Sequence, residues 1–105
     1  MLQLNRETRS GWCVVEARGR ADAESADLLE AELRGALTDH TMVAADLAGV
    51  DYISSAGLRA LLQAARAAEA AGRQFAVIAI SGPVRKVFDM SGMQQMVRCE
   101  GKLPC

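Results

Sequence analysis

The chain has 105 residues, of which 50% are hydrophobic and only 4% aromatic, so it suits one domain with an aliphatic core over residues 1–105. Its formal net charge of −1 gives no electrostatic reason to expect nucleic acid or an anionic membrane surface as a partner. No apolar run approaches the roughly 20 residues that cross a bilayer, and the N-terminal stretch MLQLNRETRS contains no apolar signal core, which indicates a cytoplasmic protein.

The N-terminal third predicts two strands followed by a helix. The strands cover residues 2–6 and 12–18, with a polar break between them that can turn the chain. Asp22 is a candidate N-cap for a helix over about 23–37. Apolar residues recur at helical spacing within this segment, namely Ala26, Leu29, Leu33 and Leu37.

The middle of the chain predicts a buried strand and a second helix. The continuous apolar run at 42–47 fits a strand buried on both faces, and residues 49–53 continue it. The helix is expected over about 56–71, with Gly72 as the residue that ends it. Its expected apolar stripe consists of Leu58, Leu61, Leu62 and Ala65.

The C-terminal third predicts a strand, a helix and a last short strand. Residues 74–80 form the clearest buried strand of the chain. Pro83 suits the first position of the next helix, Gly92 suits its end, and residues 96–100 read as a strand. The packing residues of that helix are Val84, Val87 and Phe88.

These elements follow the order β-β-α-β-α-β-α-β, which predicts an α/β domain. Strands that alternate with helices imply a mixed central sheet of about five strands with helices packed on it. In open sheets of this kind, binding sites lie in loops beyond the carboxyl ends of the strands. The stretch DYISSAG, residues 51–57, lies at such a place.

Two adjacent serines stand where this strand passes into the helix. One reading is purely structural: one serine caps the helix and the other has no special role. The alternative is a hydroxyl meant to be modified, because the free N–H groups and the positive end of a helix stabilise an added phosphate. We expect Ser54 to be the N-cap and Ser55 to be the exposed acceptor, with the small residues Ala56 and Gly57 letting another protein approach.

Other kinds of chemistry lack the residues that they need. The chain contains neither G-x-x-x-x-G-K-[ST] nor G-x-G-x-x-G, so neither phosphate-binding fingerprint is present. A serine nucleophile needs a positioned base, and the single histidine, His40, stands in a polar loop with nothing to place it near Ser55. The cysteines are odd in number and lack metal-ligand spacing, so we expect no metal, no cofactor and three reduced thiols, at Cys13, Cys99 and Cys105.

Three stretches in correct order resemble one family. GRAD (19–22) is similar to a G-x-[LF]-D pattern, and DLAGVDYISSAGLRALL (46–62) is similar to a signature that surrounds a phosphorylated serine. AVIAISGPVRKVFDMSGM (76–93) resembles the late strand and the helix that ends in F-x-x-[ST]-G. On these stretches the chain resembles the bacterial anti-sigma factor antagonists, which are stand-alone STAS domains.

The resemblance implies a partner switch rather than an enzyme. The unphosphorylated protein would bind an anti-sigma factor that is also a GHKL-type serine kinase, which releases a sigma factor or another target. Phosphorylation of Ser55 would loosen that complex, and a PP2C-type phosphatase would reset it. Asp22 matches the family's acidic residue beside the phosphorylation loop, whereas Ser54 stands where many members have aspartate. The implied partner-binding residues are Asp22, Ser54, Ser55, Ala56, Gly57 and Leu58.

Two alternatives stay open at this point. The chain is either a regulator with a phosphorylation cycle or an unphosphorylated STAS scaffold, docked as a subunit on a transporter or a sensory complex. Phosphate on Ser55 separates these readings, and an enzyme would need turnover that vanishes on replacing Ser55. Many members of the family also continue into a fourth helix after the last strand, which this chain is expected to lack.

Overall fold

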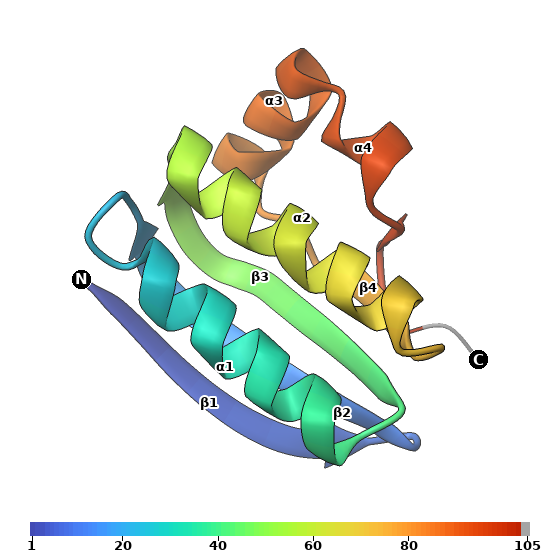
Figure 1. The fold of residues 1–105 in the computed structure, drawn as a ribbon. Coiled ribbons are helices and arrows are strands. Elements are labelled where there is room, and N and C mark those ends of the chain that lie inside the picture. Colours follow the sequence, from blue (N-terminus) through green and yellow to red (C-terminus); the bar gives the residue numbers. More distant parts are fainter. Residues whose placement is uncertain (104–105) are drawn as a thin grey trace.

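The computed structural model describes residues 1–103, which form one five-stranded sheet and four helices (Figure 1). The strands are β1 (Leu2–Arg9), β2 (Trp12–Ala21), β3 (Met42–Ile53), β4 (Gln74–Ile78) and β5 (Cys99–Glu100). The helices are α1 (Ala26–Asp39), α2 (Ser55–Ala70), α3 (Gly82–Ser91) and α4 (Met93–Met96).

The sheet has the order β1-β2-β3-β4-β5 and mixes two kinds of pairing. β1 and β2 form an antiparallel hairpin, and its two-residue loop places both Ser10 and Gly11 at positive φ, as hairpins of this length prefer. β2, β3, β4 and β5 pair in parallel through helical crossovers. The predicted mixed α/β sheet and its element order are therefore confirmed, with α4 as one addition.

The helices pack on one face of the sheet, where α1 and α2 lie side by side (Figure 1). The larger core forms between this layer and the inward residues of the strands, and it includes the predicted residues Leu29, Leu33, Leu37, Val84 and Phe88. The opposite face carries a smaller cluster built without helix residues: Trp12, Val14, Ala44, Ala76 and Ile78. β3 contributes Val43 and Ala45 to one cluster and Ala44 to the other, so the expectation of a strand buried on both faces is confirmed.

The packing face of α2 differs from the expected stripe. Leu61 is fully buried, but Leu58, Leu62 and Ala65 are only partly buried. The other residues that α2 buries are small, namely Gly57, Ala60, Ala64 and Ala68. Small side chains let α2 lie close to α1 and the sheet, so the outer leucines flank this contact instead of filling it.

Two predicted element boundaries are wrong for local reasons. α1 begins at Ala26 rather than at 23, because residues 22–25 close a separate turn first. β4 ends at Ile78 rather than at 80, since Ala79 adopts a positive φ of 55° that breaks the extended backbone.

The predicted last strand at 96–100 is also too long. Gly92 ends α3 with a φ of 74°, as expected, and the chain then forms the short helix α4. Only Cys99 and Glu100 pair with β4. Residues 101–103 contain no helix. The expectation that no further helix follows β5 also concerns residues 104 and 105, which lie outside the described residues.

Candidate functional site

The site forms where β2 and β3 end beside each other. Ala21 and Ile53 are register partners in these parallel strands. Directly after them, the Ser54 N–H donates a hydrogen bond of 2.9 Å to the Ala21 carbonyl oxygen. This bond joins the end of β2 to the start of α2, so the segment after Ala21 and the two serines share one edge of the sheet, as expected for an open α/β sheet.

Ser54 is the N-cap of α2, as the sequence predicts. Its backbone is extended, with φ −92° and ψ 174°, and its hydroxyl accepts a hydrogen bond of 3.2 Å from the Gly57 N–H. The same hydroxyl donates to the Ala21 carbonyl oxygen at 3.2 Å. Both hydrogen-bonding roles of the Ser54 hydroxyl are therefore used by the fold.

Ser55 is the first residue of α2, and its side chain is exposed. Within residues 1–103, its hydroxyl has no hydrogen-bond partner. No acidic side chain lies in the first turn of α2, so the positive end of this 16-residue helix is not neutralised locally. A phosphate on Ser55 would gain from the helix dipole and from the N–H groups that lack intrahelical partners.

Gly57 packs against the ends of β2 and β3. It is buried, and a Cβ at this position would lie 2.6 Å from the Ala21 carbonyl oxygen and 2.8 Å from Ile53 Cγ1. Only glycine lets the first turn of α2 approach the strand ends this closely. The expectation that Gly57 helps another protein to approach stays a prediction, and its half-buried neighbours Ala56 and Leu58 are accessible from outside.

Asp22 does not cap α1 directly. Its Oδ1 accepts hydrogen bonds from the Ser25 N–H at 3.1 Å and the Ser25 hydroxyl at 3.0 Å, and the Asp22 N–H donates to Ser25 Oγ at 3.0 Å. This reciprocal pair holds the turn that precedes α1. The hydrogen bond from the Ser25 hydroxyl is the main cause that lowers the pKa of Asp22, so the carboxylate stays ionised at neutral pH.

Arg20 and Tyr52 form a contact at this edge that the sequence analysis missed. The Arg20 guanidinium lies 4.2 Å from the centroid of the Tyr52 ring, and Tyr52 is 41% exposed. Such stacking of a cation on a ring orders both side chains at the surface. The contact follows from the register of β2 and β3, which pairs Arg20 with Tyr52. A single sequence does not contain that register.

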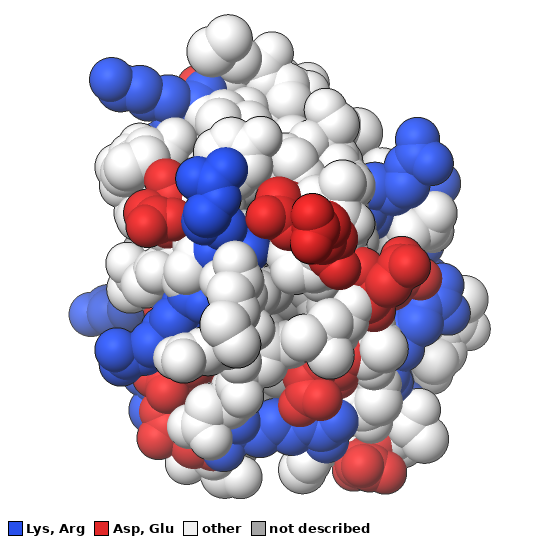
Figure 2. Space-filling model, turned by 90° about the vertical axis from the view of Figure 1, so that its left-hand side faces the viewer, with Lys and Arg blue, Asp and Glu red and all other residues white. Residues whose placement is uncertain are grey.

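The surface around the site is mixed in charge. Figure 2 shows the side of the molecule on which, in Figure 1, the β2–α1 loop and the starts of α1 and α2 lie. Basic and acidic side chains are interspersed there, with uncharged surface between them. Because no single sign of charge dominates this face, a phosphate group would change its potential strongly.

His40, Cys13 and Cys99 lie away from this site. His40 ends α1, one helix length of about 20 Å from the edge that carries Ser55, so it is not placed to act as a base for that hydroxyl. Cys13 and Cys99 are free thiols, and burial raises the pKa of each. Cys105 lies outside the described residues.

Two kinds of feature are absent from residues 1–103. No helix in this part of the chain is long and apolar enough to cross a membrane. Histidine, cysteine, aspartate and glutamate side chains do not gather there in threes or more in a way that would hold a metal ion.

Comparison with known proteins identifies the family. A family model described as "Mlab, STAS domain" matches residues 5–98. The chain is 32% identical over 92 residues to BtrV of Bordetella bronchiseptica, and the match covers 87% of this chain and 79% of that protein. The name of BtrV assigns it the role of an anti-sigma factor antagonist.

Solved structures show the same fold. An anti-sigma factor antagonist from Mycobacterium paratuberculosis superposes with a TM-score of 0.82 at 24% identity, covering 98% of this chain and 88% of that one. SpoIIAA in its unphosphorylated form gives a TM-score of 0.76 at 20% identity, with coverage of 95% and 90%. The phosphorylated form of SpoIIAA from Bacillus gives 0.69 at 20% identity, with coverage of 97% and 93%. These likenesses show the fold, and the matched family model and the identity to BtrV show that the chain belongs to the STAS-domain family.

Proposed function

We propose that the chain, as one STAS domain over residues 1–105, is an anti-sigma factor antagonist whose partner binding is switched by phosphate on Ser55. In its unphosphorylated form it binds an anti-sigma factor that is also a GHKL-type serine kinase, and this binding releases a sigma factor or another target. The kinase phosphorylates Ser55, the complex loosens, and a PP2C-type phosphatase restores the first state. The protein itself acts in the cytoplasm as a regulator and not as an enzyme.

One observation carries this proposal, namely the unequal use of the two serine hydroxyls. Ser54 is engaged by Ala21 and Gly57, whereas Ser55 is exposed at the start of α2. A hydroxyl that the fold does not use is available to an incoming phosphoryl group, and the helix start favours the charge that results. SpoIIAA, a relative of the same fold, has been solved in a phosphorylated form.

The surface chemistry supports release on phosphorylation. The proposed partner contact consists of Ser55 with Asp22, Ser54, Ala56, Gly57 and Leu58. Asp22 follows Ala21, which is the register partner of Ile53, so the two segments end at the same edge of the sheet. Phosphate adds about −1.5 to −2 charges to a face that already holds the Asp22 carboxylate, and no described arginine or lysine forms an ion pair with that carboxylate. Repulsion and the cost of desolvating the phosphate therefore oppose a tight complex.

Calorimetry with the GHKL-type kinase of the same organism tests this function. The unphosphorylated protein should bind, and protein that carries one phosphate should bind at least tenfold more weakly. A sample incubated with the kinase and a non-hydrolysable ATP analogue is the control, and it should keep the full affinity. Equal affinity of the two forms would contradict the phosphorylation switch and would favour the alternative, an unphosphorylated STAS scaffold.

A further inference from the structure

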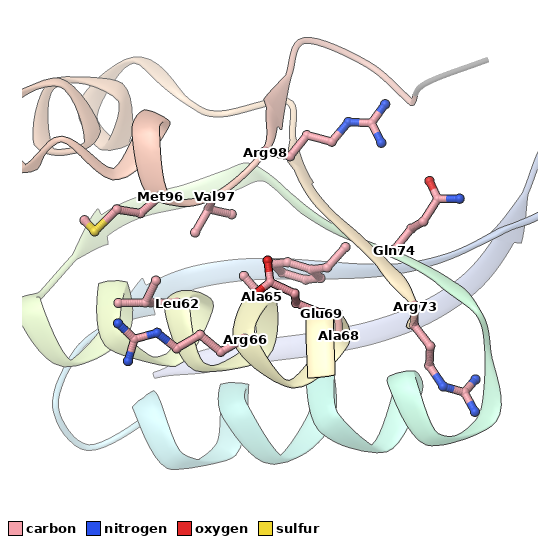
Figure 3. Close-up of a pocket in the computed structure, with 11 residues that line it drawn as sticks. Leu62, Ala65, Arg66, Ala68, Glu69, Arg73, Gln74, Met96, Val97 and Arg98 are labelled. Atoms are coloured by element: carbon pink, nitrogen blue, oxygen red, sulfur yellow. The ribbon is translucent and has the colours of Figure 1, made fainter. Parts of the chain in front are cut away.

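A groove lies on the other half of α2, away from the two serines. It is bounded by the C-terminal half of α2, the start of β4 and the segment from α4 to β5, and its volume is about 500 Å³ (Figure 3). Phe75 and Val97, which are both buried, form its apolar floor. Leu62 and the half-exposed Met96 form its lip. Its volume lies within the range of ligand-binding clefts, and polar and charged side chains share its lining with the apolar ones.

The charged groups around this groove are mainly cations. Arg66, Arg73 and Arg98 line it, against the single carboxylate of Glu69, although the whole chain has a net charge of −1. Arg66 is exposed and forms an ion pair with no carboxylate of residues 1–103. Arg73 donates to the His40 carbonyl oxygen at 3.0 Å, and only Arg98 has an acidic partner, Glu100, at 3.1 Å. At least one guanidinium group of the groove, that of Arg66, is therefore available to an anionic group of a ligand.

The directions of the arginines decide between two kinds of anionic occupant. In Figure 3 the side chains of Arg66, Arg73 and Arg98 point away from one another, and each leaves the groove on a different side. Guanidinium groups that diverge in this way do not converge on one carboxylate or phosphate head group. They match several carboxylates that are spread along a chain, as in an acidic peptide.

We propose that this groove binds an acidic segment of a protein partner, which inserts one apolar side chain over Phe75 and Val97 while its carboxylates meet Arg66 and Arg98. The groove does not include the phosphoacceptor, because Arg66 is eleven residues after Ser55, or about 16 Å along α2. Its binding chemistry does not depend on a phosphorylation cycle at Ser55.

The groove is also continuous with the face that carries Ser55. Leu58 and Leu62 are one helical turn apart on α2, and both are only partly buried. They form an apolar track from the first turn of α2 to the lip of the groove. A protein seated at the start of α2 can therefore extend an acidic segment along this track without leaving apolar surface uncovered between the two contacts.

Nuclear magnetic resonance titration of the ¹⁵N-labelled full chain tests the proposal with defined probes. The first probe is the peptide acetyl-Glu-Asp-Phe-Glu-Asp-amide. There are two comparison probes. One is the same peptide with lysines in place of the acidic residues, and the other is the fatty acid anion decanoate. The acidic peptide should produce saturable shifts at residues 65–69 and 96–98. The lysine peptide should produce none, and decanoate should bind at least fivefold more weakly than the acidic peptide.

Two substitutions at one position and a matched control make the test specific. Arg66→Glu should weaken the acidic peptide at least tenfold, and Arg66→Gln, which only removes the charge, should weaken it less. Lys86→Glu reverses an exposed charge on α3 outside the groove and should leave the affinity within twofold. The proposal is overturned if the acidic peptide gives no saturable shifts at the groove, if the lysine peptide binds equally well, or if decanoate binds as tightly as the peptide.

Discussion

The Ser54 hydroxyl donates a 3.2 Å hydrogen bond to the Ala21 carbonyl oxygen and accepts one of 3.2 Å from the Gly57 N–H. It therefore joins the end of β2 to the first turn of α2 and leaves the neighbouring hydroxyl of Ser55 unused. This arrangement gives the two adjacent serines different roles, one in stability and one in the proposed switch.

The first prediction separates these roles by stability. Ser54→Ala removes a capping hydrogen bond and should lower the free energy of unfolding by about 1 kcal/mol. Ser55→Ala removes an exposed hydroxyl that has no hydrogen-bond partner, so it should change the free energy of unfolding by no more than about 0.5 kcal/mol. Urea unfolding of both variants measures the pair, and a larger loss for Ser55→Ala would contradict the assignment.

Gly57 gives a second prediction about packing at the site. In Gly57→Ala the new methyl group meets the Ala21 carbonyl oxygen and Ile53, so the variant should lose about 1–3 kcal/mol of stability. Gly82→Ala is the matched control at the start of α3, because a Cβ there has no heavy atom within 4 Å. The control should be neutral or stabilising by up to about 1 kcal/mol, and equal losses in the two variants would refute the packing explanation.

The third prediction concerns acid and Asp22. The pKa of Asp22 is lowered in the folded protein, chiefly by the Ser25 hydroxyl, so its ionised form stabilises the fold above the unfolded-state pKa. That contribution is lost as the pH falls from about 5 through the lower folded-state pKa. The stability difference between the wild type and Asp22→Asn should therefore shrink over this range in thermal melts at a series of pH values.

Ser25→Ala checks the cause of that pH dependence. This variant removes the hydroxyl that bonds the Asp22 carboxylate, so its stability difference from the wild type should shrink in the same acidic range. A difference that stays constant from neutral pH to acid in both variants would show that the turn at 22–25 does not depend on the ionised carboxylate.

The fourth prediction concerns the charge at Ser55. Ser55→Asp should weaken the complex with the GHKL-type kinase, and Ser55→Ala should keep the complex while it blocks phosphorylation. A carboxylate carries less charge than a phosphate, so the loss of affinity in Ser55→Asp should be smaller than the loss on true phosphorylation. Calorimetry on the two variants measures this, and tighter binding of Ser55→Asp than of Ser55→Ala would rule out release driven by charge.

Features that depend on neighbouring residues in the sequence were predictable. The cap at Ser54, the end of α3 at Gly92 and the buried strand at 42–47 each follow from local rules of capping, turn geometry or hydrophobic patterning. The start of α1 was not, because the hydrogen bonds between Asp22 and Ser25 compete with helix formation over those residues.

Features that depend on contacts across the sheet were not predictable from one sequence. The close packing of Gly57 against Ala21 is one of these contacts. The pairing of Arg20 with Tyr52 needs the register of β2 and β3. β5 is only two residues long and is formed by its pairing with β4, so its own sequence carries too little pattern to set its bounds.

Ser55, and not Ser54, is expected to receive the phosphate, and mass spectrometry of the digested protein shows which serine does. The wild type and Ser54→Ala are incubated with the GHKL-type kinase and Mg-ATP, and the phosphopeptides that cover residues 51–62 are fragmented to locate the modification. One phosphate, on Ser55, is expected in both proteins. Phosphate found on Ser54 alone, or its loss in a folded Ser54→Ala variant, would show that Ser55 is not the acceptor.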